Sequence, residues 1–140
     1  MRFLVMSSRK TWLVVNSRSG SNNDTALAAL EQSLTAHGLS PDTRFEFPAE
    51  DLPSRARLSD ESVSRLIVFT GDGSLNAVIE AASGWSGEVL VLPGGTMNLL
   101  SVRLHGEGAT CDDILDCIAR GAYRRVRPIM ACCDAGRAHA

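Results

Sequence analysis

The sequence predicts an α/β fold: a doubly wound, mostly parallel sheet with helices on both faces, in three layers. Short continuous apolar runs, typical of strands buried on both faces, alternate with segments whose apolar residues recur at helical spacing. Glycine-bearing turns separate several of these strands from the helices that follow. Parallel neighbours need crossover connections, which are usually helical. With 140 residues, 44% of them hydrophobic, the chain is long enough for one domain with its own core.

The first part of the chain predicts two strands and one long helix. Residues 12–16 form a continuous apolar run that ends in polar turn residues, as expected of a strand covered on both faces. A helix should follow between the polar caps at 22–24 and Gly38, because leucines recur at helical spacing. These leucines are Leu27, Leu30 and Leu34. Residues 43–47 alternate enough for a second strand, and the polar stretch 49–64 predicts one short surface helix or turn.

The middle of the chain predicts a strand, a tight glycine turn and a helix. Residues 66–69 are a buried type of strand that leads directly into the turn at 70–74. From Leu75 onward apolar residues again step at helical spacing, until Gly84 supplies a stop. Strand, turn and helix then occur a second time, with the strand at 89–92 and a short helix at 96–103.

The last predicted helix begins at a capping box. Thr110 and, three residues later, Asp113 are the residue types that satisfy the first backbone N–H groups of a helix. Gly121 lies where this helix should end. The following residues, 123–133, have mixed polarity and predict a final extended segment.

Composition excludes several classes of protein. The formal net charge is −2, without the strong basic excess of a dedicated nucleic-acid binder, so no nucleic-acid partner is expected. The opening apolar run at 3–6 is too short for a secretory signal or a membrane span, and residues 1–10 are interpreted as an N-terminal tail. The adjacent Cys132 and Cys133 have no further ligands at metal spacing, which favours reduced, idle thiols. A soluble, cytoplasmic protein is therefore expected.

Three glycine-bearing turns each follow a strand and lead toward a helix. They are Asn-Ser-Arg-Ser-Gly at 16–20, Thr-Gly-Asp-Gly-Ser-Leu-Asn at 70–76 and Pro-Gly-Gly-Thr-Met-Asn at 93–98. In a doubly wound sheet, ligands bind in the crevice at the carboxyl ends of the strands. Glycine lets a phosphate approach the backbone, and the free N–H groups of a helix N-terminus favour its negative charge. The three turns therefore predict a phosphate-binding site.

Asp72 is the one acidic residue within these turns. A carboxylate repels phosphate unless a magnesium ion or a substrate hydroxyl lies between them, so Asp72 points to metal-assisted phosphoryl transfer. The alternative is that Asp72 only caps the helix that follows. Asn76 stands where a dinucleotide fingerprint needs its third glycine, and no G-x-x-x-x-G-K-[ST] motif occurs, so neither a dinucleotide-binding dehydrogenase nor a P-loop NTPase is expected.

The turn at 70–76 resembles the Gly-Gly-Asp-Gly-Thr-x-Asn loop of the diacylglycerol kinase catalytic-domain family. The turn at 93–98 is similar to the Pro-x-Gly-Thr-x-Asn turn of that family, and residues 16–20 are similar to its opening Asn-Pro-x-Ser-Gly. The resemblance covers about residues 11–131. Departures from the family pattern stand at Ser17, Thr70, Ser74 and Ala77. NAD kinases and phosphofructokinases share a glycine-aspartate-glycine loop, and the turn at 93–98 narrows the resemblance to the lipid kinases.

The resemblance implies ATP-dependent phosphorylation of a lipid hydroxyl, of diacylglycerol or sphingoid-base type, with magnesium. It implies that Asp72 is catalytic and faces the metal, that the turns contact the nucleotide, and that the protein acts peripherally at the inner membrane surface. By position, the nucleotide-contacting residues are Asn16, Ser19, Gly20, Thr70, Gly71, Asp72, Gly73, Ser74, Asn76, Gly94, Gly95, Thr96 and Asn98.

The resemblance also implies a domain organisation. Residues 11–131 correspond to the nucleotide-binding domain, and residues 132–140 to the start of a β-rich second domain that would supply the lipid cleft. Without that domain the chain is expected to have little or no kinase activity. One alternative is a non-catalytic nucleotide-binding or dimerising module, a homodimer, with a vestigial site; another is an NAD kinase relative. Arginines near the end face either anionic lipid or the absent domain. They are Arg120, Arg124, Arg125 and Arg127.

Overall fold

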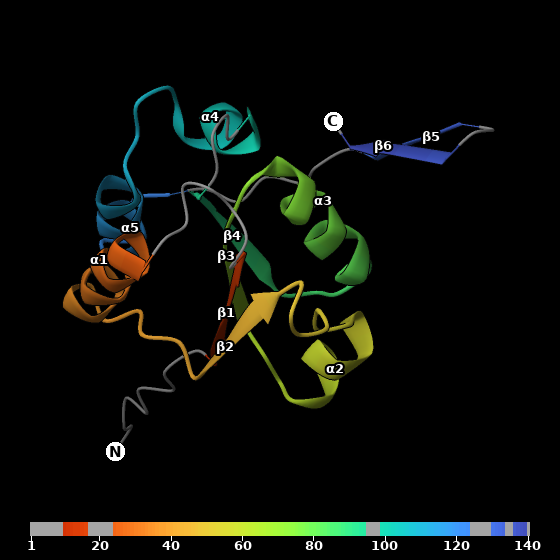
Figure 1. The fold of residues 1–140 in the computed structure, drawn as a ribbon, viewed down its shortest axis with the longest axis horizontal. Helices are drawn as coiled ribbons and strands as arrows, with labels where there is room; N and C mark the ends of the chain where they lie inside the picture. Colours follow the sequence, from red (N-terminus) through yellow and green to blue (C-terminus); the bar gives the residue numbers. More distant parts are fainter. Residues whose placement is uncertain (1–9, 17–23, 95–98, 124–129, 134–135, 140) are drawn as a thin grey trace, which may run out of the picture.

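The computed structural model describes residues 10–16, 24–94, 99–123, 130–133 and 136–139, and it confirms the three-layer α/β fold (Figure 1). Four parallel strands form one sheet in the order β2-β1-β3-β4. They are β1 (Thr11–Asn16), β2 (Thr43–Phe47), β3 (Arg65–Thr70) and β4 (Glu88–Pro93). Val14 of β1 lies opposite Phe45 of β2 on one side and Val68 of β3 on the other. The chain therefore adds β2 on one side of β1 and then crosses to the other side to add β3 and β4. This change of direction makes the sheet doubly wound.

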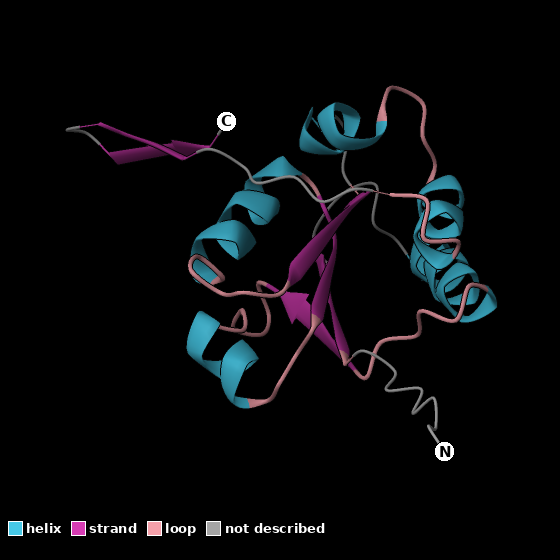
Figure 2. Cartoon of the chain, turned by 180° about the vertical axis from the view of Figure 1, so that it is seen from behind, coloured by secondary structure: helices cyan, strands magenta, loops and turns pink. Residues whose placement is uncertain are grey.

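Helices cover both faces of this sheet. The helices are α1 (Asp24–Ala36), α2 (Arg55–Asp60), α3 (Asp72–Ala81), α4 (Leu99–His105) and α5 (Cys111–Ala119). Figures 1 and 2 show α1 and α5 together on one face of the sheet and α2 and α3 on the other. The short helix α4 lies beyond the carboxyl ends of the strands, beside the start of α3 (Figure 1).

The core has two halves, one on each face of the sheet. Successive side chains of a strand point to opposite faces, so each buried strand contributes to both halves. One half lies under α2 and α3 and includes Trp12, Val14, Leu58, Leu66, Val68 and Val78. The other lies under α1 and α5 and includes Leu13, Val15, Leu34, Ile67, Phe69 and Leu115. All six residues of β3 are buried, which explains why the strands appear in the sequence as continuous apolar runs.

Most predicted elements are confirmed close to their expected bounds. The strand β2 occupies 43–47 as predicted, while β3 and β4 extend their predicted runs by one residue at each end. The short helix expected within 49–64 is α2. The capping box of α5 is present: Thr110 Oγ1 accepts from the Asp113 N–H at 3.1 Å, and Asp113 Oδ2 accepts from the Thr110 N–H at 3.3 Å.

The structure corrects the sequence-based bounds at three places. The helix α3 begins at Asp72, so the expected turn at 70–74 is mostly the first helical turn; Gly71, in extended backbone conformation, is the N-cap. The helix expected over 96–103 corresponds to α4, which ends two residues later, at His105. The Nε2 of His105 lies 2.9 Å from the Val91 carbonyl oxygen. Within the expected extended segment, β5 (Met130–Cys133) pairs antiparallel with β6 (Gly136–His139), a strand that the sequence did not predict.

Candidate functional site

The three glycine-bearing turns begin at one edge of the sheet. Asn16 is the last residue of β1, and Thr70 is the last residue of β3. Thr70 lies opposite Pro93, which ends β4. Because β1, β3 and β4 are parallel neighbours, their carboxyl ends meet at the same edge. The fold therefore places the starts of all three turns where doubly wound proteins bind ligands.

A side-chain hydrogen bond joins the first turn to the second. The Asn16 amide Nδ2 donates to the Ser74 Oγ at 2.6 Å, in a partly buried contact between residues 58 positions apart. Ser74 belongs to the first turn of α3, so this contact ties the end of β1 to the start of that helix. Two of the predicted site residues are thus in direct contact.

Asp72 joins the second turn to the helix that follows the third. Its Oδ2 accepts a hydrogen bond from the backbone N–H of Leu99 at 3.0 Å, and its Oδ1 accepts from that of Leu100 at 3.5 Å. These two N–H groups open α4 and have no acceptor within their own helix. The N-cap of α3 is Gly71, with no side-chain capping bond. The carboxylate therefore caps α4 and not α3, the helix on which it lies.

The glycines at this edge have different surroundings. A Cβ on Gly94 would lie 2.6 Å from both the Phe69 carbonyl carbon and the Thr70 nitrogen, so this glycine allows the end of β4 to pack against the β3 backbone. A Cβ on Gly73 would meet nothing within 4 Å, and Gly73 is exposed. Of the two, only Gly73 leaves open space where a ligand could approach the backbone.

The remaining described site residues differ in their exposure. Thr70 is only 3% exposed, and its hydroxyl donates to the Gly71 carbonyl oxygen at 3.0 Å, inside the turn. Asn76 is exposed one helical turn after Asp72, so the two residues lie on the same side of α3. Cys111 lies near this edge, with its Sγ 3.9 Å from the Pro93 carbonyl oxygen, and burial raises the pKa of its thiol to about 11, which keeps it neutral.

Several predicted residues lie outside the part of the chain that the structure describes. For the site these are Ser19, Gly20, Gly95, Thr96 and Asn98, and for the arginine cluster Arg124, Arg125 and Arg127. The fourth arginine, Arg120, is exposed, and its Nε donates to the Asp116 Oδ2 at 2.9 Å. This hydrogen bond raises the pKa of Arg120 above its already high ordinary value.

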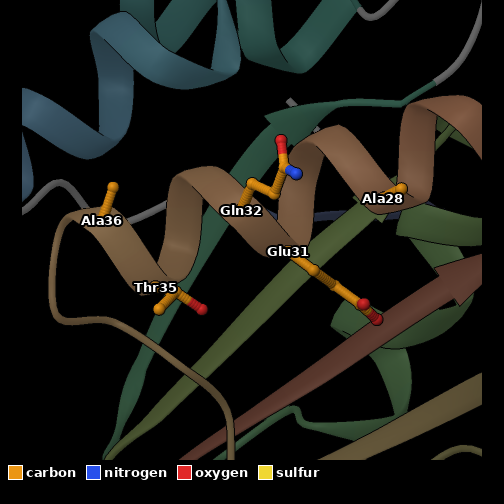
Figure 3. Close-up of a pocket in the computed structure, with 5 residues that line it drawn as sticks. All are labelled: Ala28, Glu31, Gln32, Thr35 and Ala36. Atoms are coloured by element: carbon orange, nitrogen blue, oxygen red, sulfur yellow. The ribbon is translucent and has the colours of Figure 1, made fainter.

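Two hollows lie beside α1, one along its exposed side and one between this helix and the start of β2. One, of about 560 Å³, is lined by the side chains that Figure 3 shows along α1: Ala28, Glu31, Gln32, Thr35 and Ala36. The other, of about 580 Å³, is lined by Glu31, Thr35 and residues 40–44 at the start of β2. Both open to solvent and lie away from the carboxyl ends of the strands. Glu31 itself forms an ion pair with Arg44. Neither hollow belongs to the candidate site.

The described residues contain no group of three or more His, Cys, Asp or Glu side chains that could hold a metal ion. A metal at Asp72 would therefore need oxygen ligands that the substrate and water supply, which is the usual way in which proteins bind Mg²⁺. In the same described part of the chain, no helix has the length and apolar character needed to cross a bilayer.

The fold and the site together define the class: a doubly wound α/β domain with candidate ligand-binding residues at the carboxyl edge of its sheet. A comparison with protein-family models then matches residues 10–131 to the diacylglycerol kinase catalytic domain. The match covers most of the chain, which therefore belongs to this family of kinase domains. A comparison with curated proteins found no significant match.

Proposed function

We propose that this chain is the nucleotide-binding domain of a lipid kinase that transfers a phosphoryl group from ATP to the hydroxyl of a diacylglycerol or sphingoid-type lipid. One observation carries the proposal: hydrogen bonds across the carboxyl edge connect Asn16 to Ser74, and Asp72 to the start of α4. Family membership indicates what these residues at the carboxyl edge would bind, because the family consists of kinase domains, which bind a nucleotide. Acting on lipid, the protein would work in the cytoplasm, peripherally at the inner membrane surface.

The first turn of α3 would hold the phosphates of the nucleotide. Its backbone N–H groups have no acceptor within the helix, and its dipole favours negative charge at this end. Gly73 leaves room for a phosphate beside this turn. The Ser74 hydroxyl and the exposed Asn76 amide would add polar contacts, and Asn16 would lie toward the nucleoside. Roles for the predicted residues outside the described part of the chain stay predictions of the sequence.

Asp72 fits a magnesium ion by its chemistry. A carboxylate offers about four acceptor positions, and the two α4 amides engage one oxygen each, so acceptor positions remain for a cation. Magnesium prefers oxygen ligands and usually binds through one or two carboxylates together with phosphates and water. When bound with ATP, it would neutralise charge on the phosphates. Asp72 would hold it, and the open backbone at Gly73 would receive the phosphates.

The proposed unit of function is residues 11–131, nearly the range that the family model matches. The lipid cleft in a β-rich second domain that begins at residues 132–140, and formation of a homodimer, are further proposals. Exposed aliphatic side chains would favour self-association, and three of them lie on α4. The exposed residues are Val89, Leu99, Val102 and Leu104.

A Gly73→Ala variant tests the nucleotide site without disturbing the fold. The added methyl group meets no atom within 4 Å, and alanine is favoured over glycine in a helix by about 0.5–1 kcal/mol, so the free energy of unfolding should hold or rise. If phosphate lies beside this backbone, however, the affinity for Mg-ATP should fall about tenfold or more. Isothermal titration calorimetry and urea unfolding measure the two effects.

The control is Ser83→Ala, an exposed change near the other end of α3 that should alter neither quantity. Unchanged ATP affinity in Gly73→Ala would contradict the proposed site. If the unaltered chain gives no heat and no thermal shift at millimolar ATP, ADP and magnesium, the vestigial module is the better description. Where binding occurs, transfer of labelled phosphate to diacylglycerol or sphingosine in vesicles identifies the lipid class.

A further inference from the structure

We propose that Asp72 is a positioning residue whose carboxylate fastens the start of α4 to the first turn of α3, and so fixes the relative position of two helices at the proposed nucleotide site. The effect on nucleotide affinity rests on the proposed function, whereas the contact itself does not. The role is separate from any contact between Asp72 and a metal, because it acts through the backbone of Leu99 and Leu100.

The contact is well placed to fix the start of α4. Asp72 Oδ2 and Oδ1 accept from two consecutive N–H groups, at 3.0 Å from Leu99 and 3.5 Å from Leu100, so both oxygens engage the same helix end. The Leu99 side chain is 58% exposed and contributes little packing. Leu100 packs only partly against the core. A polar contact therefore carries much of what holds this end of the helix.

The other end of α4 has its own polar anchor. His105 Nε2 lies 2.9 Å from the Val91 carbonyl oxygen of β4, and Ser101, between the two anchors, is buried. A helix of seven residues is too short to be stable by itself, so its attachments decide where it lies. Loss of the Asp72 contact would release the N-terminal end of α4 while His105 keeps the other end in place.

Two substitutions separate positioning from metal binding. Asp72→Asn removes the negative charge that a metal needs but keeps a carbonyl oxygen that accepts from Leu99. Asp72→Ala removes both. Because the two variants have the same charge, charge cannot cause a difference between them, and the exchange rate at Leu99 shows whether the contact to α4 does. A matched control is Asp113→Ala, which removes a carboxylate that accepts a backbone hydrogen bond at the start of another helix, α5.

Amide hydrogen exchange of the whole chain tests the contact directly. The N–H groups of Leu99 and Leu100 have no acceptor in their own helix, so their protection reports the bond to Asp72. We expect Asp72→Ala to speed exchange at Leu99 about tenfold, as for a lost helix cap, and Asp72→Asn to keep exchange within about threefold of the unaltered chain. In calorimetry, Asp72→Ala should bind magnesium-free ATP about five- to tenfold more weakly than Asp72→Asn.

Each outcome decides the proposal. Equal exchange at Leu99 in both Asp72 variants and the unaltered chain would overturn it, as would equal ATP affinity of Asp72→Asn and Asp72→Ala. A fall in affinity of the same size in Asp113→Ala would also overturn it, because general loss of stability would then be the cause. Failure of the unaltered chain to bind ATP would refute the proposed function, while the exchange rates would still confirm or refute the contact between Asp72 and α4.

Discussion

Trp12 fills a large part of the core beneath α2 while its indole N–H has no hydrogen-bond partner among the described residues. The side chain is 1% exposed and packs against Phe45, with ring centroids 5.1 Å apart. The Arg57 guanidinium lies 5.2 Å from the Trp12 ring centroid, so the ring also forms a cation–π contact with Arg57. Trp12 thus stabilises the core by its apolar area, and its buried donor opposes that gain.

This balance predicts a small effect for one substitution of Trp12 and a large loss of stability for another. Phenylalanine keeps most of the apolar area and removes the unpaired donor, which alone costs about 1–3 kcal/mol, so Trp12→Phe should stay within about 1 kcal/mol of the unaltered free energy of unfolding. Trp12→Ala leaves a cavity and should lose about 3–5 kcal/mol. Urea unfolding measures both. A Trp12→Phe variant as unstable as Trp12→Ala would contradict this balance between apolar area and unpaired donor.

At the residue scale, the sequence predicts which residues lie at the carboxyl edge of the sheet better than it predicts what each of them contacts. Asn16 and Ser74 can be placed at one edge because each stands near the end of a strand or the start of the next helix. The contact from Asp72 to Leu99 depends on where α4 docks, which no local pattern specifies. The different surroundings of Gly73 and Gly94 also follow from the close approach of β4 to β3, which is tertiary information.

Single elements show how local signals fix a helix end. The capping box of α5 satisfies backbone groups at its start through Thr110 and Asp113. Two residues of this helix, Ile114 and Leu115, are buried against the sheet. The cap therefore stabilises the start of a helix whose apolar face covers one half of the core.

Thr110→Ala should lower the free energy of unfolding by about 1 kcal/mol, because the hydroxyl that accepts from the Asp113 N–H is lost. Ser59→Ala, an exposed change inside α2, should stay within about 0.5 kcal/mol of the unaltered chain. Chemical denaturation of the two variants side by side gives the comparison. Equal stabilities for the two would mean that the capping box contributes nothing to α5.

Elements with strong local signals were predictable, and those that depend on distant partners were not. The strand β2 and the start of α5 follow from alternation and capping residues. The helix α3 starts three residues before its first apolar residue, Leu75, because a helix can begin on polar residues as soon as the strand ends. The strand β6 carries no apolar alternation, and it is defined only by its pairing with β5.

At the scale of the whole molecule, the sheet divides the core into two halves that share a backbone but no side chains. Val78 of α3 belongs to one half, and Ile114 of α5 to the other. Since the sheet lies between them, a change in one half should leave the packing of the other intact.

The double variant Val78→Ala, Ile114→Val tests this independence. The single changes should cost about 2 kcal/mol and about 1 kcal/mol, and the double variant should cost their sum within about 0.5 kcal/mol. Urea unfolding followed by both fluorescence and circular dichroism measures the sum and the cooperativity. A coupling larger than about 1 kcal/mol would mean that strain passes through the sheet from one half to the other.

The strand order β2-β1-β3-β4 has a consequence for how the polypeptide is made. β1 is complete at residue 16, but β3, its partner on one side, begins only at residue 65. At about 5–20 residues per second, a ribosome needs about 3–10 s to supply that partner. During this interval one edge of an apolar strand has no neighbour, so the nascent chain is open to pairing with strands of other chains until β3 emerges.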